Sequence, residues 1–290
     1  MIVITDQRCT RYATPGHPER PARISRTLTA LESQQRIAVE FDRPADVAET
    51  QLLRVHSPDH LERLRVAADF DADTPAHPGI REHAERSVGS ALRALDLALA
   101  GRRVFSLIRP PGHHATADRA MGFCYLSTAA IVVKEALARG LERVAVFDFD
   151  VHHGNGTEAV LLGTPGCAFH SVHQFPCYPG TGEVSHQNAR NHPVLPGAHR
   201  GAYQDALKRA LEETARYQPQ LLVVSAGFDA FRGDPLSMAP LEGEDFEWLG
   251  RELHAFGIPT CSVLEGGYSD ELPGLILEYL VGLEGPAAGV

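Results

Sequence analysis

Two kinds of hydrophobic pattern alternate along the chain, one typical of buried strands and one typical of helices. Short, nearly continuous apolar runs are typical of strands buried on both faces. They lie at Met1–Ile4, Arg103–Ile108, Arg143–Phe147, Cys167–His170, Gln220–Ser225 and Pro259–Leu264. Between them, apolar residues recur with the helical period in Pro21–Arg36, His60–Ala68, Arg81–Ala100, Leu126–Arg139, Tyr203–Tyr217, Glu244–Ala255 and Leu275–Leu283. This alternation predicts an α/β protein with a parallel sheet covered by helices on both faces.

Two long stretches show neither period, namely Phe70–Ile80 and Ser171–Gly201. Long loops in a compact domain usually build a site or its rim. No repeat, low-complexity tract or linker interrupts the pattern, so we expect residues 1–290 to form a single domain.

Chemically capable side chains follow the predicted strand Arg143–Phe147. The next residues are Asp148-Phe-Asp150-Val-His152-His153-Gly154. In extended backbone, residues two apart project to the same side. Asp150 and His152 are therefore expected to aim at one point, with Asp148 close behind. A carboxylate and an imidazole at one point suit a divalent metal such as zinc, whereas a hydrogen-bonded polar turn is the alternative reading.

Three other predicted strands end in the same way. Arg109-Pro-Pro-Gly-His113-His114 follows Arg103–Ile108, and its prolines fix the direction of the backbone before two imidazoles that suit acid–base chemistry. Sites of open α/β sheets form outside the carboxyl ends of the strands. One cleft could thus collect His113, His114, Asp150, His152, Asp229 and Tyr268. Taken alone, Asp229 could equally be a turn former and Tyr268 a packed rim residue.

Composition narrows the class of protein. The 290 residues are 43% hydrophobic and 22% charged, which is normal for a folded globular chain. The net charge is −10 and no block of Lys or Arg occurs, so direct nucleic-acid binding is not expected. Five scattered cysteines predict reduced thiols in a cytoplasmic protein. No apolar run approaches membrane-spanning length, and the first residues resemble a strand rather than a signal peptide.

These motifs together resemble the zinc-dependent histone deacetylase family, particularly its bacterial and class II-type members. The matching segments, in the order the family has them, are His17-Pro-Glu-Arg-Pro-Ala-Arg23, Leu53-Arg-Val-His-Ser-Pro58, Arg109–Ala115, Met121-Gly-Phe-Cys124, Asp148–Thr157, Tyr178-Pro-Gly-Thr-Gly182, Ala226-Gly-Phe-Asp229 with Gly233-Asp-Pro235, and Leu264-Glu-Gly-Gly-Tyr268. The resemblance implies the arginase–deacetylase fold, a three-layer α-β-α arrangement around a mostly parallel sheet of about eight strands. The apolar runs predict only six strands, so we expect the remaining edge strands to lie in segments that the pattern leaves as loops.

The resemblance also implies a role for each residue of the cleft. Zinc, or iron(II) in its place, would be held by Asp150, His152 and Asp229, which leaves an open position for water and substrate. His114 would be the general acid–base, supported by Asn155. His113 would be its electrostatic partner, oriented by Asp148. The Tyr268 hydroxyl would donate a hydrogen bond to the oxyanion.

Further positions match the family's ion site and substrate tunnel. A structural potassium ion would contact Asp148, Asp150, His152, Ser171 and the Val172 carbonyl, although Ser171 is equally well explained as a plain strand-end hydroxyl. Phe123 and Tyr178 match the aromatic pair around the acyl-lysine stem, and Gly122, Gly266, Gly267 and Leu236 would line the same tunnel. Arg23 matches an arginine near an internal pocket below the metal.

Several features bear on the substrate. The run Asp69-Phe-Asp71-Ala-Asp73 is typical of a solvated turn, but Asp71 and Asp73 could also bind a substrate backbone or attract a cationic ligand. An acetylpolyamine amidohydrolase is therefore an alternative, even though Leu236 stands where one polyamine-selective branch has glutamate. A binuclear manganese ureohydrolase would need carboxylates at positions 154 and 231, which are Gly154 and Phe231. A non-catalytic acyl-lysine-binding module is a third alternative, although every catalytic group of the family is present.

The sequence thus predicts a hydrolase that removes acyl groups, acetyl by default, from Nε-acyl-lysine in proteins or peptides, or from a small acylated amine. No pattern in the chain predicts an oligomeric state.

Overall fold

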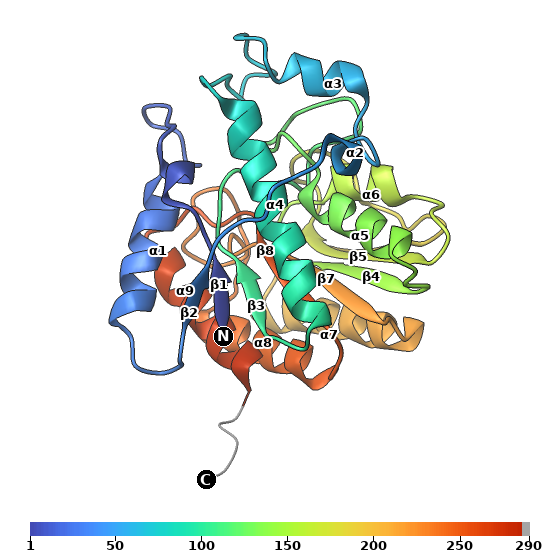
Figure 1. The fold of residues 1–290 in the computed structure, drawn as a ribbon. Helices are drawn as coiled ribbons and strands as arrows, with labels where there is room; N and C mark the ends of the chain where they lie inside the picture. The colour runs from blue at the N-terminus through green and yellow to red at the C-terminus, as the bar shows by residue number, and fades with distance from the viewer. Residues whose placement is uncertain (286–290) are drawn as a thin grey trace.

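One sheet of eight parallel strands forms the centre of the computed structural model, which describes residues 1–285 (Figure 1). Its strands are β1 (Ile2–Ile4), β2 (Glu40–Asp42), β3 (Val104–Ser106), β4 (Val144–Asp148), β5 (Cys167–Gln174), β6 (Ala189–Val194), β7 (Leu221–Ala226) and β8 (Thr260–Leu264). They lie in the order β2-β1-β3-β8-β7-β4-β5-β6, and every neighbouring pair is parallel. The predicted α/β class with an eight-stranded sheet is confirmed.

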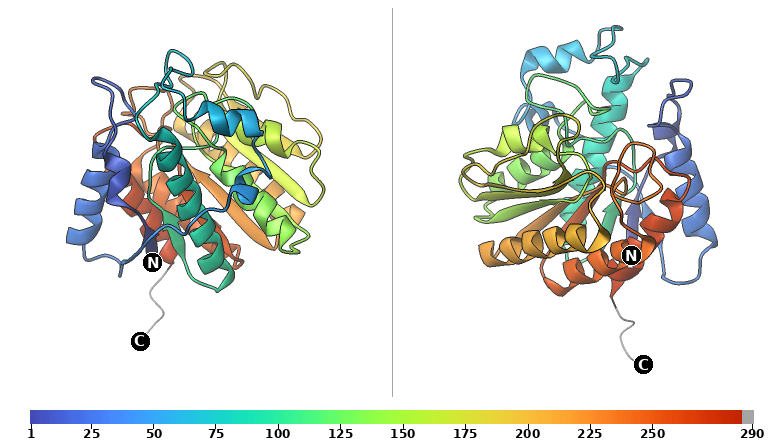
Figure 2. Two further views of the ribbon diagram at one scale, coloured as in Figure 1. Left: turned by 45° about the horizontal axis from the view of Figure 1, so that its top comes forward. Right: turned by 180° about the vertical axis from the view of Figure 1, so that it is seen from behind.

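Helices cover both faces of this sheet (Figure 2). One face packs against α1 (Ala22–Ser33), α7 (Arg200–Tyr217), α8 (Gly243–Ala255) and α9 (Leu272–Glu284). The other packs against α4 (Ile80–Leu99) and α5 (Thr128–Ala138). Successive side chains of a strand point to opposite faces. Val104 therefore contributes to one core and Phe105 to the other. Short helical segments are η1 (Gln7–Thr10), α2 (Glu49–Leu52), α3 (Pro58–Arg63) and α6 (Asn155–Leu161).

The two strands that the apolar pattern missed, β2 and β6, are the two edges of the sheet. The β2 side chains are partly or fully exposed, so no apolar run marks the strand. In β6, buried and exposed residues alternate and Pro193 occupies a place that only an edge strand tolerates. The expectation of edge strands within the loops is confirmed.

Several element boundaries differ from the prediction, and the largest differences concern β5 and the short helices. β5 continues to Gln174, so Ser171 and Val172 lie inside a strand and not at the start of a loop. Its polar residues, among them His170 and His173, interrupt the apolar run although all are buried. The helix expected over His60–Ala68 ends at Arg63, and α6 was not expected.

None of the helices within residues 1–285 combines the length and the apolar character that crossing a bilayer would require.

Candidate active site

The order of strands places four polar strand ends side by side. β3, β8, β7 and β4 are consecutive neighbours in the sheet, and all four are parallel. The segments that leave their carboxyl ends carry His113 and His114, Tyr268, Asp229, and Asp150 with His152 respectively. These are the residues that the sequence assigned to one cleft, and the structure brings them together.

Asp150, His152 and Asp229 form the tightest group. One ligand atom of each lies within 4.8 Å of the others, and Asp150 and Asp229 are 0% exposed. His152 Nδ1 lies 3.2 Å from Asp150 Oδ1 and 3.0 Å from Asp229 Oδ2. Ligand atoms around a tetrahedral ion with bonds of about 2.0–2.2 Å are themselves roughly 3.3 Å apart. The three side chains are therefore spaced as ligands of one small cation.

The electrostatics of Asp150, His152 and Asp229 also favour a bound cation. Burial and the neighbouring Asp150 raise the pKa of Asp229 to about 7. Burial also disfavours ionisation of Asp150, but the charge of His113 and the hydrogen bond with His152 outweigh it and hold the pKa of Asp150 low. The two carboxylates outweigh burial at His152 and raise its pKa well above the usual value. Two buried carboxylates thus lie close together with only partial charge compensation, which a divalent ion would complete.

Backbone amides hold the ligands in place. Gly266 N donates to Asp150 Oδ2 at 2.7 Å, and Val151 N donates to Asp229 Oδ1 at 2.9 Å. A side chain on Gly266 would overlap the carboxylate of Asp229, so only glycine permits this approach. Such outer contacts orient ligands before the ion arrives.

His113 and His114 are neighbours whose pKa values are shifted in opposite directions. Their ring centroids are 4.0 Å apart. Burial opposes charge on His113, yet Asp150 and Asp148 raise its pKa to about 10, and its Nδ1 lies 3.1 Å from Asp148 Oδ2. Burial, together with the charge of His113, lowers the pKa of His114 well below its usual value. His114 is therefore a neutral imidazole beside a fixed cation.

Asn155 sets which nitrogen of His114 is free. Its amide oxygen lies 2.8 Å from His114 Nδ1 and accepts a hydrogen bond from it. The unprotonated Nε2 is then left to accept a proton from another molecule. This is the support that the sequence assigned to Asn155.

A cavity of about 370 Å³ opens onto these groups. It is lined by His17, Pro18, Asp73, His114, Gly122, Phe123, His152, Cys177, Tyr178, Leu236 and Tyr268. Gly122 has a φ of +56°, and a Cβ there would come within 2.5 Å of His114 Cδ2. The cavity thus runs from an acidic and aromatic rim down to imidazoles and a phenol.

Three residues that the resemblance assigned to the tunnel and rim are not among those that line this cavity. Gly266 and Gly267 do not line the cavity, because Gly266 lies against the carboxylates and Gly267 packs against Phe228 and Leu272. Asp71 does not line it either; its carboxylate accepts a hydrogen bond from Asp73 N at 3.0 Å and so closes the turn that presents Asp73.

Arg23 lies next to Tyr268 but does not itself line the cavity. Arg23 is 4% exposed, its Nε donates to Gly267 O at 2.7 Å, and its guanidinium lies 4.9 Å from the centre of the Tyr268 ring. Arg23 is thus a buried charge that also pairs with Glu19. Its place fits the internal position that the resemblance implied, and not a helix-surface charge.

The residues assigned to potassium also lie close together. Asp148 and Ser171 are register partners on β4 and β5, and Val172 follows Ser171. All three are 0% exposed. Ser171 Oγ lies 2.8 Å from His173 Nδ1.

Two supporting carboxylates were not found from the sequence. Glu265 Oε2 accepts hydrogen bonds from Gly112 N at 2.7 Å and His113 N at 3.1 Å. Asp234 Oδ2 accepts from Tyr268 N at 2.6 Å. Both residues belong to motifs that match the family. Their contacts with backbone amides, however, depend on the conformation of the loops, which the hydrophobic pattern does not predict.

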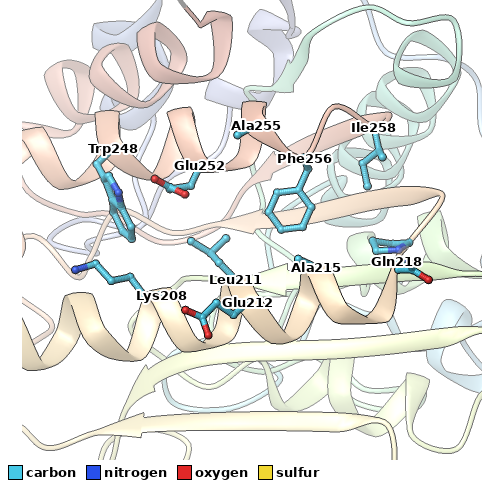
Figure 3. Close-up of a pocket in the computed structure, with 11 residues that line it drawn as sticks. Lys208, Leu211, Glu212, Ala215, Gln218, Trp248, Glu252, Ala255, Phe256 and Ile258 are labelled. Carbon is cyan, nitrogen blue, oxygen red and sulfur yellow. The ribbon is translucent and has the colours of Figure 1, made fainter.

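A second and larger cavity, of about 710 Å³, lies between α7 and α8 (Figure 3). Trp248 and Phe256 face Leu211 and Lys208 across it. None of the residues assigned to chemistry lines it, so we do not place the active site there.

Known proteins resemble this chain over nearly its whole length. Residues 17–282 match the family model of the histone deacetylase domain. The chain is 39% identical over 284 residues to a histone deacetylase-like amidohydrolase of Pseudomonas aeruginosa, with 89% of this chain and 74% of that protein covered. It is 36% identical over 302 residues to a probable deacetylase of Methanothermobacter thermautotrophicus, with 98% and 91% covered. A solved acetylpolyamine aminohydrolase from Burkholderia pseudomallei superposes with a TM-score of 0.91 at 27% identity, covering 98% of this chain and 99% of that one.

Proposed function

Because the chain belongs to the histone deacetylase family, whose members on the arginase–deacetylase fold include deacetylases and amidohydrolases, we propose that it is a zinc-dependent Nε-acyl-lysine deacylase. The reaction is hydrolysis of the amide: the acyl carbon gains oxygen from water, the C–N bond breaks, and a free amine and a carboxylate leave. Acetyl is the default acyl group.

The observation that supports zinc is the spacing and burial of Asp150, His152 and Asp229. Two carboxylates that each lie within about 3.2 Å of one imidazole, all three side chains being buried, match a catalytic site with three protein ligands. When bound there, zinc lowers the pKa of a water molecule and polarises the acyl carbonyl. Iron(II) is the alternative ion for this set of donors.

Three side chains around this centre contribute to proton transfer and to stabilisation of the developing charge. Neutral His114 takes the proton of the attacking water on Nε2 and returns it to the nitrogen of the leaving amine. The fixed positive charge of His113 keeps His114 neutral until that transfer occurs. Tyr268, held by Asp234, donates a hydrogen bond to the oxygen of the acyl group as negative charge develops there.

We also propose a structural potassium ion behind this centre. Asp148, Asp150, His152, Ser171 and the carbonyl of Val172 would hold it. The support is that Asp148, Asp150 and Ser171 are 0% exposed and bring carboxylate and hydroxyl oxygens to one edge of β4 and β5.

The lining of the cavity fits a long, thin substrate. Phe123 and Tyr178 would flank an alkyl chain, and His17 packs edge-on against Phe123 at 4.6 Å. A lysine side chain carries such a stem between its backbone and its acylated nitrogen.

An acetylpolyamine is the second candidate substrate, and Asp73 favours it. The residue is exposed at the rim and lines the cavity, so its carboxylate could pair with the distal ammonium of a polyamine. A solved relative is an acetylpolyamine aminohydrolase. Leu236 gives no second carboxylate in the lining.

Release of amine from three substrates tests these assignments. They are an acetyl-lysine peptide, an acetylated spermidine or putrescine, and agmatine, each with chelator and after zinc is restored. Chelator-sensitive turnover of the peptide supports the lysine deacylase. Turnover of the acetylpolyamine alone would assign the second substrate, and release of urea from agmatine would overturn the proposal.

A further inference from the structure

A second group of imidazoles and a carboxylate lies away from the cleft, where α7 crosses β5 and β6. It consists of His170 on β5, His192 on β6 and Glu213 on α7, with one ligand atom of each within 4.8 Å of the others. None of the three lines the catalytic cavity. We call it the edge cluster, because β6 is an edge strand.

The register of the two strands explains how the imidazoles meet. His192 is the register partner of Val172, and His170 precedes Val172 by two residues on the same face of β5. The two histidines are thus diagonal neighbours, a separation that long and aromatic side chains can bridge. Their rings are nearly parallel, at 18°, with centroids 6.4 Å apart. Glu213 reaches them from the helix that packs on this face.

The polar atoms of this cluster lack partners. His170 is 3% exposed, and neither of its ring nitrogens has a hydrogen-bond partner within residues 1–285. His192 Nε2 is also buried and has none. Its nearest carboxylate oxygen, Glu213 Oε2, is 3.6 Å away, which is too far for a hydrogen bond. Buried polar groups without partners are rare in folded proteins, and they indicate a bound ion or an ordered water molecule at this place.

The spacing of the donors also suits a metal ion. Burial lowers the pKa of His192, so this imidazole is neutral near pH 7. The separation of 3.6 Å between His192 Nε2 and Glu213 Oε2 is close to the roughly 3.3 Å between ligands of a tetrahedral ion. The carboxylate is only partly buried, and a cavity of about 420 Å³ opens beside His170 and Glu213, so solvent can reach the cluster.

Positive neighbours limit the choice of ligand. Arg190 and Arg216 line the same cavity, and Arg209 and Arg190 both affect the pKa of His192. Arg190 is committed to the carbonyls of Gln187 and Ala189, and Arg216 to Glu212. A cation held by long-range charge alone is therefore disfavoured, whereas one held by nitrogen donors is not. Imidazole donors select transition metals over magnesium or calcium.

We propose that His170, His192 and Glu213 form a second site for a divalent transition metal, with zinc as its expected occupant. The ion would join the edge strand β6 and the neighbouring strand β5 to α7. It would take no part in hydrolysis.

Counting bound zinc in the whole protein tests the proposal. The chain is stripped with chelator, dialysed against micromolar free zinc, and analysed for metal. The test variant is His192→Gln/Glu213→Gln, which leaves the buried His170 in place. The matched control is His186→Gln/Glu212→Gln, which changes two exposed residues outside the cluster.

The wild type and the control should each bind two equivalents, and the test variant one, with kcat/KM unchanged. A wild type that binds no more zinc than the test variant would overturn the edge cluster as a metal site. One equivalent in the wild type and none in the test variant would support the edge cluster and instead overturn the catalytic zinc, so the two proposals fail separately.

Discussion

The catalytic group and the edge cluster have similar donors but differ in how the fold holds them. At Asp150 and Asp229, backbone amides fix each carboxylate from outside, and each carboxylate lies within hydrogen-bonding distance of His152. In the edge cluster, no hydrogen bond within residues 1–285 positions the imidazole of His170, and its partners come from an edge strand and a helix. The first is organised before an ion binds, whereas the second would be completed by its ion.

This difference shows what a reactive site requires beyond donors. An ion that only joins elements tolerates donors that close around it. An ion that must present water and substrate at a fixed angle to His114 and Tyr268 needs ligands that do not move. The catalytic residues accordingly lie on four adjacent strand ends in the middle of the sheet, and the edge cluster lies at its margin.

Removing a catalytic ligand should have the largest effect. Asp229→Ala takes away one of two buried carboxylates and leaves Asp150 and His152 without the third donor. Zinc affinity should fall by more than the ~10–100-fold that loss of an outer-shell partner costs, and turnover should reach background. Metal analysis together with an amine-release assay checks both. Full activity with one fewer bound ion would mean that the reaction uses another centre.

Replacing His114, the proposed general base, should lower turnover without changing metal binding. His114→Ala should lower kcat by about 10²–10⁴-fold, because it removes proton transfer. Bound zinc should stay unchanged, since His114 is not a member of the ligand group. Undiminished turnover in zinc-loaded His114→Ala would reject the acid–base role.

The oxyanion donor comes next. Tyr268→Phe keeps the ring between Phe123 and Arg23 but removes the hydroxyl. We expect kcat to fall about 10²-fold with little change in KM, because the hydrogen bond strengthens as charge develops. Steady-state kinetics on the acetyl-lysine peptide distinguish this from a pure KM effect, which would assign Tyr268 to substrate binding instead.

Removing Asp234 should leave the loop that carries Tyr268 less firmly positioned, as the donors of the edge cluster are. Asp234→Ala removes the acceptor for Tyr268 N and Ser269 N, so the loop that carries the phenol loses its anchor. We expect kcat to fall by roughly 10-fold, less than in Tyr268→Phe, with zinc content unchanged. Asp234→Asn keeps an acceptor oxygen and should recover part of the rate. Equal losses in both variants would point to charge, and not to positioning.

The same difference explains what could be predicted from the sequence. The proposed catalytic residues could be grouped into one cleft from the sequence because each follows an apolar strand, and parallel strands bring their carboxyl ends to one edge. Only some of the residues assigned to the tunnel line the cavity in the structure. Tyr178 and Leu236 lie in it, whereas Gly266 and Gly267 lie behind it, because a glycine motif does not tell whether the backbone faces a cavity or a carboxylate.

The edge cluster could not be found in this way. His170 is separated from His192 by a segment that the apolar pattern leaves irregular, and β6 carries a proline and exposed residues. Their proximity depends on the register of β5 and β6, which follows from pairing in three dimensions. Glu213 is one of several charged residues on α7, and only helix packing distinguishes it.

The smallest effect we predict is on thermal stability, and it tests whether the edge cluster joins the margin of the sheet. A ligand present at a hundredfold excess over its Kd stabilises the folded state by ~2.7 kcal/mol, and each kcal/mol raises the Tm by about 2–4 °C in a domain approaching this size. Measured in the Asp229→Ala background, where the catalytic ion is removed, zinc should therefore raise the Tm by roughly 5–10 °C. Adding His192→Gln/Glu213→Gln to that background should abolish the shift, whereas adding His186→Gln/Glu212→Gln should not. Zinc shifts of equal size in both combined variants would mean that the ion binds elsewhere. The margin of the sheet would then be held by β5–β6 pairing and the apolar contacts of α7 alone.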